Sequence, residues 1–155
     1  MNNLNRIVAS IAFLFSLVVY IMTMAPTTSF WDCGEFIATS VIMGVPHPPG
    51  TPFYLLLGNL FSQLPTFDDI GARVNLISPI FSAFAVMFLY LIIVQLIEEY
   101  RGKAKKFPDY LITYGSAFIG ALTFAFTDSH WFNAVEAEVY SLSTFFTSIV
   151  VWLIL

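Results

Sequence analysis

Two short acidic clusters contain the side chains best suited to chemistry. In the first, Asp32 and Glu35 stand three residues apart, and a helix would place both carboxylates on one face. Such a pair can accept a proton from a reacting hydroxyl as a general base. The alternative is that Asp32 caps the start of a helix and Glu35 interacts favourably with its first turn. The spacing alone leaves both interpretations open.

The second cluster contains Glu136 and Glu138, with Asp128 and His130 a few residues before them. A spacing of two places both glutamates on one face of an extended segment, whereas in a helix only one would point inward. The alternative is that these acids are solvated charges at a membrane interface, with Trp131 as an interfacial anchor. This cluster is the second candidate for a polar site.

Several of these residues are of types that bind metals. Oxygen and imidazole ligands are available from Asp32, Glu35, His47, His130, Glu136 and Glu138. No HxxxH, HExxH or DxD spacing occurs among them. We therefore expect no definite cofactor and assign no metal ligands, while a divalent metal stays an open alternative. The single cysteine, Cys33, excludes a disulfide within the chain.

The composition indicates the environment in which these residues lie. The 155 residues are 58% hydrophobic and only 10% charged, whereas soluble proteins are about 25% charged. This predicts a membrane protein and excludes a disordered or nucleic-acid-binding chain. Because a spanning helix needs about 17–25 apolar residues, the charge-free runs predict four spans, at 7–24, 74–96, 110–126 and 140–155.

The connection between the first two predicted spans, residues 25–73, is too long and too apolar to be a simple link. Residues 36–43 form one short helical candidate, and the X-Pro steps after it predict extended backbone. A second short helix should start at Pro52, with Thr51 as its N-cap, and end near residue 61. We therefore expect an all-α polytopic membrane protein with two short membrane-parallel helices in its first outer loop.

The basic residues predict the orientation, because they favour the cytoplasmic side of short loops. Five of the six lie before the first span or between the second and third: Arg6, Arg101, Lys103, Lys105 and Lys106. This places the amino terminus in the cytoplasm and residues 25–73 and 127–139 on the outer face. The chain ends within an apolar stretch, so we expect the amino-terminal part of one larger transmembrane domain.

Arg73 is the one basic residue on the predicted outer face. Its planar guanidinium suits bidentate contact with a phosphate at the height of the lipid headgroups. The alternatives are a salt bridge to Asp68 or Asp69 and simple anchoring to headgroups. These interpretations stay open on the sequence alone.

Three motifs in order carry a family resemblance. The segments FWDCGEF (30–36), PHPPGTP (46–52) and AVEAEVYSL (134–142) resemble the bacterial protein O-mannosyltransferase-like membrane proteins of glycosyltransferase family 117. That family belongs to the glycosyltransferase C superfamily. The resemblance covers nearly the whole chain but only the amino-terminal part of such proteins. It implies a glycosyltransferase C-like fold in a bacterial cytoplasmic (inner) membrane, with the site on the outer face.

The resemblance also implies an activity, the transfer of a sugar from a polyprenyl-phosphate-linked donor to a hydroxyl acceptor, often a protein Ser or Thr. Asp32 matches the catalytic acidic position and Glu35 is its neighbour, so both are expected to be catalytic, with Asp32 the general base of an inverting reaction. The expected substrate-binding residues are His47, Arg73, His130, Glu136, Glu138 and Tyr140, with Arg73 stabilising the departing phosphate. The fragment alone is expected to be inactive.

Two other functions are compatible with a polytopic membrane chain. A transporter would carry protons or ions on carboxylates inside its spans, whereas the four predicted spans contain no charged residue. A non-catalytic membrane subunit is the second alternative, because the fragment lacks the rest of any active site. The clustering of acids outside the spans favours the enzyme.

Overall fold

The computed structural model describes residues 3–48 and 51–155. Within these ranges every regular element is helical and no strand occurs, which confirms the predicted all-α class. The elements in chain order are α1 (Asn3–Thr23), α2 (Cys33–Ile42), α3 (Pro52–Ser62), α4 (Ile70–Asn75), α5 (Ile77–Arg101), α6 (Phe107–Tyr110), the π-helical turn η1 (Leu111–Gly115), α7 (Ser116–Ala125), α8 (Asp128–Ala134) and α9 (Tyr140–Ile154).

The number of helices able to cross a membrane is smaller than the four expected. In the described part of the chain, α1 and the stretch Ile70–Arg101 are long and apolar enough. A third span results if Phe107–Ala125 and Asp128–Ala134, which meet at a bend of 69°, are counted as one. Helix α9, with 15 residues up to Ile154, belongs to the shorter apolar helices. The structure therefore supports two or three spans.

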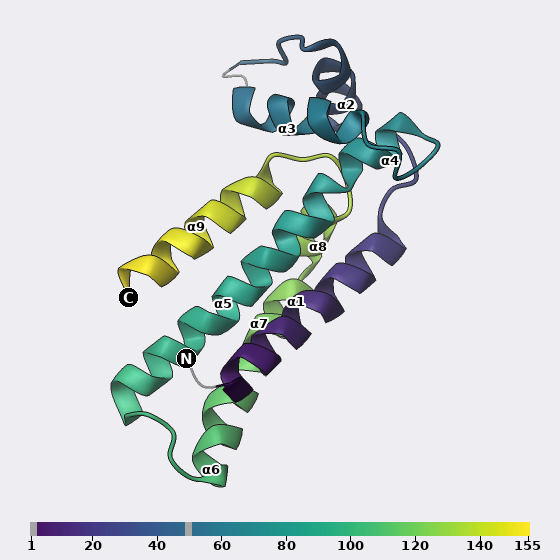
Figure 1. Cartoon of the computed structure of the whole chain (residues 1–155). Coiled ribbons are helices and arrows are strands. Elements are labelled where there is room, and N and C mark those ends of the chain that lie inside the picture. Colours follow the sequence, from purple (N-terminus) through teal and green to yellow (C-terminus); the bar gives the residue numbers. More distant parts are fainter. Residues whose placement is uncertain (1–2, 49–50) are drawn as a thin grey trace.

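The long helices pack around α5. Helix α5 lies between α9 on one side and α1 and α7 on the other (Figure 1), and it contacts all three. Their core contains Tyr20 and Tyr90 together with a row of buried alanines on α7, namely Ala117, Ala121 and Ala125. Small side chains let helix backbones approach closely, which is how helices associate where lipid replaces water.

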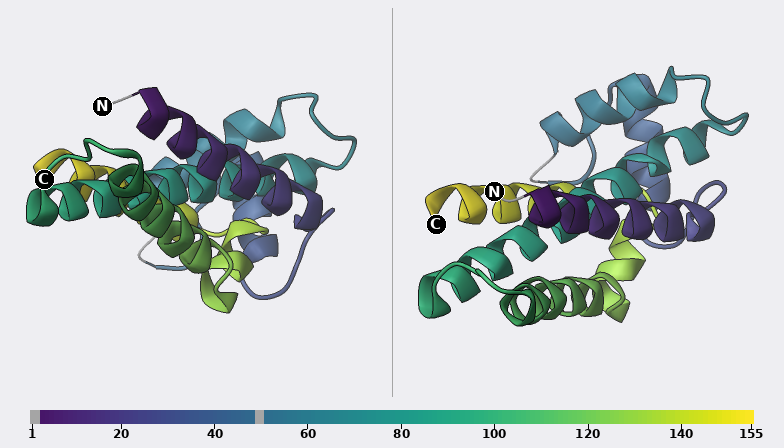
Figure 2. Two further views of the ribbon diagram at one scale, coloured as in Figure 1. Left: turned by 90° about the horizontal axis from the view of Figure 1, so that it is seen from below. Right: turned by 60° about the horizontal axis from the view of Figure 1, so that its bottom comes forward.

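The three short helices α2, α3 and α4, here called the shelf, gather at one end of this bundle (Figures 1 and 2). Helices α2 and α3 confirm the two short helices expected in the long connection, and α3 begins at Pro52 as predicted. They are in close contact at Gly58, where an added Cβ would lie 2.2 Å from the Ser40 Oγ. That the shelf lies parallel to a membrane surface stays a prediction.

The shelf and the basic connection lie at opposite ends of the molecule. Residues 102–106, which link α5 to α6, are at the bottom of Figure 1, whereas the shelf is at the top. The first turn of α1, which carries Arg6, is also at the lower end. This arrangement separates five of the six basic residues from the acidic clusters, and the sixth, Arg73, lies in the shelf.

Candidate functional site

The first turn of α2 positions the first acidic cluster. Asp32 is the residue before this helix and is exposed, but its side chain makes no capping hydrogen bond. The capping interpretation therefore does not hold for the Asp32 carboxylate. Glu35 lies within the first helical turn, where the positive end of the helix dipole favours a negative charge.

Trp31, directly before Asp32, has an unusual backbone conformation that the sequence did not reveal. Its φ is 56°, in the left-handed region, and its side chain is 84% exposed. This region costs about 1–2 kcal/mol for a residue other than glycine. Strained residues of this kind are often found at functional sites.

His47 returns to the start of α2 through a sharp reversal of the chain. Met43 takes a left-handed conformation (φ 52°), and the Gly44 amide donates to the Thr39 carbonyl at 2.8 Å. An extended residue advances about 3.3 Å and a helical one about 1.5 Å. A few extended residues after Gly44 therefore cover about the same distance as two turns of α2 and bring His47 back beside Glu35. The X-Pro steps favour this extended backbone.

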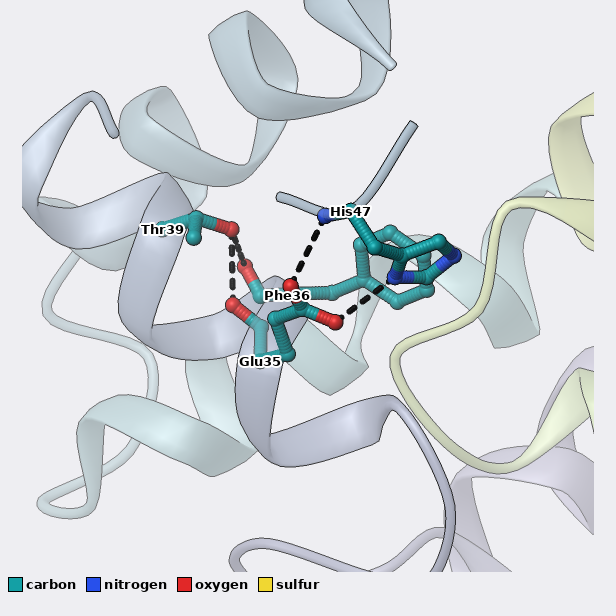
Figure 3. A network of polar contacts seen from close by, with 4 residues as sticks. All are labelled: Glu35, Phe36, Thr39 and His47. Carbon is teal, nitrogen blue, oxygen red and sulfur yellow. Dashed lines mark hydrogen bonds and ion pairs between the residues drawn. The ribbon is translucent and has the colours of Figure 1, made fainter. Parts of the chain in front are cut away.

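Glu35 binds His47 with both carboxylate oxygens (Figure 3). Its Oε1 accepts from the His47 backbone amide at 2.8 Å, and its Oε2 lies 2.7 Å from the imidazole Nδ1. The imidazole also packs against Phe36, with ring centroids 5.9 Å apart. The side-chain hydrogen bond lowers the pKa of Glu35 and raises the pKa of His47. The contact therefore favours a charged carboxylate beside a protonated imidazole.

Asp32 completes a group of three possible metal ligands. One ligand atom from each of Asp32, Glu35 and His47 lies within 4.8 Å of the others. Among the residues that the structure describes, these three are the one such group. The sequence contains six possible ligands, and their spacing did not show which of them lie together. The fold of residues 43–47 brings His47 to Asp32 and Glu35.

The second acidic cluster is buried, contrary to the solvated-charge interpretation. Glu136 is 1% exposed and Glu138 is 6% exposed, and both lie in the non-helical connection between α8 and α9. Burial, together with the negative charges of Glu136 and Asp32, raises the pKa of Glu138 to about 7. The two clusters are therefore close enough to interact electrostatically. We call Asp32, Glu35, His47, Glu136 and Glu138 the acidic site.

Asn75 joins the parts of the acidic site, and the sequence reading missed it. Its Nδ2 donates to the carbonyls of Ala25 and Thr27, each at 2.8 Å. Its Oδ1 accepts from the Ala137 amide at 3.0 Å and lies 3.6 Å from the Cys33 Sγ. The available signal was an asparagine inside an apolar stretch, since a polar residue there is costly unless it is hydrogen-bonded.

Arg73 has a different environment from the one expected. Its Nε donates to the Phe67 carbonyl at 2.6 Å, and its terminal nitrogens donate to the carbonyls of Ser62 (3.1 Å) and Asp68 (3.4 Å). The guanidinium thus closes the connection between α3 and α4 through backbone contacts. These contacts indicate a structural role and give no support to phosphate binding by Arg73.

His130 and Tyr140 lie together in a separate pocket. His130 is buried beside Phe124 and Tyr20, with ring centroids 4.3 Å and 6.1 Å away. With Tyr140 it lines a pocket of about 220 Å³ whose other polar residues are Thr127, Ser129, Asn133, Ser141 and Thr144. Nearness to Glu136 in the sequence had suggested a shared site, but α8 directs His130 into the aromatic packing.

Two curated proteins are similar to this chain in sequence. A Dictyostelium discoideum protein named protein O-mannosyl-transferase tmem260 is 25% identical over 143 residues, covering 91% of this chain and 16% of the relative. A mouse protein named protein O-mannosyl-transferase TMEM260 is 29% identical over 131 residues, covering 84% of this chain and 17% of the relative. No solved structure matches the chain. The chain thus spans about a sixth of the length of these curated relatives.

These relatives correct the expected localisation. Both come from eukaryotes, so the expectation of a bacterial inner membrane is contradicted, and a eukaryotic membrane is indicated instead. The profile of the family described as Protein O-mannosyl-transferase TMEM260 N-terminal domain matches residues 32–155, which include both acidic clusters. Because this match covers well over half of the chain, the chain belongs to the TMEM260 N-terminal domain family of protein O-mannosyl-transferases.

Proposed function

We propose that this chain carries the acidic site of a membrane glycosyltransferase that transfers a sugar from a polyprenyl-phosphate-linked donor to a hydroxyl of a protein. The observation that carries the proposal is Asp32, an exposed carboxylate with no capping hydrogen bond beside the Glu35–His47 pair. The names of the relatives support glycosyl transfer to protein. A glycosyltransferase C-type fold is part of the same proposal.

In the proposed reaction Asp32 is the general base. It accepts the proton of the acceptor hydroxyl while the new oxygen–carbon bond forms, and the bond from the sugar carbon to the phosphate oxygen breaks with its electrons leaving on the phosphate. Attack on the face opposite the leaving group inverts the sugar carbon. General base catalysis contributes about 10²–10⁴-fold to a rate, so positioning and phosphate stabilisation supply the rest.

The neighbours of Asp32 have distinct roles in this proposal. The Glu35–His47 contact fixes the segment that borders Asp32, with hydrogen bonds of 2.7 and 2.8 Å. Glu138 has a pKa raised to about 7 by burial, so near neutral pH it can either accept or donate a hydrogen bond to a sugar hydroxyl. The exposed ring of Trp31 offers an apolar face next to Asp32 in the sequence.

Substitution of Asp32 tests the proposal. We expect Asp32→Asn in the full-length protein to lower the rate of sugar transfer to an acceptor peptide by about 10²-fold or more, because the amide cannot accept the proton. Asp68→Asn, which removes an exposed carboxylate from the connection between α3 and α4, should retain the rate. The assay follows transfer from a radiolabelled polyprenyl-phosphate sugar, and full activity of Asp32→Asn would refute the role of Asp32.

A further inference from the structure

The acidic site carries more negative charge than its one basic group can balance. Four carboxylates belong to it, and its single basic group is the imidazole of His47. All six Lys and Arg residues of the sequence are among the described residues. Five of them lie at or near the opposite end of the bundle, around the start of α1 and the 101–106 segment. The sixth, Arg73, donates to three backbone carbonyls.

This charge conflicts with the donor of the proposed function. A polyprenyl-phosphate sugar carries a negative phosphate, and its departure during transfer concentrates negative charge on one oxygen. Carboxylates repel such a group, and this repulsion grows as the charges come closer and as water is excluded between them. A site that accepts this donor beside Asp32 and Glu35 therefore needs a positive charge that its own side chains do not supply.

We propose that Asp32, Glu35 and His47 form a divalent-cation site that supplies this charge, an inference that rests on the proposed function. Their ligand atoms lie within 4.8 Å of one another. Bonds of about 2.1 Å from one ion bring its ligands to about 3–4 Å apart, so small side-chain rotations suffice. The Glu35 Oε2 and the His47 Nδ1 now share a hydrogen bond of 2.7 Å, and a bound ion would take the place of the proton between them.

The ligand set indicates the kind of ion. Two carboxylates and one imidazole favour a transition ion such as Mn²⁺ or Zn²⁺ over Mg²⁺ or Ca²⁺, which prefer oxygen ligands alone. Three protein ligands leave coordination positions open for phosphate oxygens, as in catalytic rather than structural sites. Asp32 can give one oxygen to the ion and keep the other for the acceptor hydroxyl.

A second observation strengthens the need for positive charge. Glu136 is 1% exposed, and its Oε1 has no hydrogen-bond partner among the described residues. A buried carboxylate oxygen without a partner is costly, and a cation nearby lowers that cost. Glu136 belongs to the same acidic site through its interaction with Glu138.

Manganese binding tests the inference without donor or acceptor. Full-length protein in detergent is freed of metal with EDTA, dialysed and titrated with Mn²⁺, and free Mn²⁺ is followed by its electron paramagnetic resonance signal. We expect one Mn²⁺ per protein, displaced by Zn²⁺, and a loss of affinity of at least about 10-fold in His47→Ala and Glu35→Gln. Asp68→Asn should bind as the unsubstituted protein does. His47 is exposed, so His47→Ala is expected to fold, and its thermal unfolding checks this.

Each result bears on one of the two proposals. Failure to bind Mn²⁺, or equal binding by His47→Ala, would overturn the cation site. Sugar transfer that continues at full rate in excess EDTA would also overturn it and leave the proposed function standing. Stoichiometric Mn²⁺ binding that depends on His47, in a protein that transfers no sugar from polyprenyl-phosphate donors, would support the cation site and refute the proposed function.

Discussion

At the scale of single residues, the acidic site depends on a few polar side chains that apolar segments hold in place. Glu35 fixes His47 by two hydrogen bonds, and Asn75 connects the backbone before α2 with the backbone that carries Glu136 and Glu138. Asn75 is fully buried and uses both its amide nitrogen and its oxygen. Its loss would leave buried carbonyl and amide groups without partners.

Substitution of Asn75 tests this connection. We expect Asn75→Ala to lower the free energy of unfolding by about 2–4 kcal/mol, because each buried polar group left unpaired costs about 1–3 kcal/mol. Asn133→Ala removes one exposed hydrogen bond within α8, to the Ser129 carbonyl, and should have little effect. Thermal unfolding of the full-length protein measures the stability of both variants. Hydrogen exchange of the Ala137 amide measures the loss of its hydrogen bond to Asn75. Equal stability of the two variants would contradict the role of Asn75.

At the scale of elements, the shelf is held by the close contact of α2 with α3. An added Cβ at Gly58 would lie 2.2 Å from the Ser40 Oγ and 2.6 Å from its Cβ. The Asn59 side chain strengthens the same contact by donating to the Ser40 carbonyl at 3.0 Å. Because α2 carries Asp32 and Glu35, its position on α3 also determines where the acidic site lies.

Enlarging Gly58 tests the shelf. We expect Gly58→Ala to force α2 and α3 apart and to destabilise the protein by about 1–3 kcal/mol, as overpacking does. Adding Ser40→Gly should restore most of the loss by removing the opposing side chain. Gly115→Ala is the matched control, because its added Cβ would meet its nearest neighbour, the Leu111 Cδ1, at 3.9 Å. The measurement is the melting temperature of each of the three variants. If Gly58→Ala without the second substitution melts at the same temperature as the unsubstituted protein, the close contact of α2 with α3 is contradicted.

At the scale of the whole molecule, the separation of charges is the feature that sequence reasoning could predict. The apolar runs predicted α1 and α5 because burial in lipid demands long charge-free helices, and Pro52 predicted the start of α3. Only part of the acidic site could be predicted from the spacing of its residues. Asp32 and Glu35 are neighbours by helical spacing, whereas the return of His47 and the bridge through Asn75 depend on long-range folding.

The charge separation predicts opposite membrane sides for the two ends of the bundle. In intact cells or sealed vesicles, a membrane-impermeant maleimide should label Asp68→Cys and Lys105→Cys from opposite sides. The native Cys33 is buried and burial raises the pKa of its thiol, so its reaction should be slow. The unsubstituted protein serves as the background control. Labelling of both variants from one side would contradict the predicted orientation.

The bridge through Asn75 also sets the order in which the site can be built during synthesis. Asn75 is 50 residues from Ala25 and 62 residues from Ala137 along the chain. A nascent chain that has emerged only as far as α5 therefore contains the shelf but lacks Glu136 and Glu138. The carboxylates meet only after α8 has been made, so the acidic site is completed after the shelf, when α1, α5 and α7 are already available to hold it.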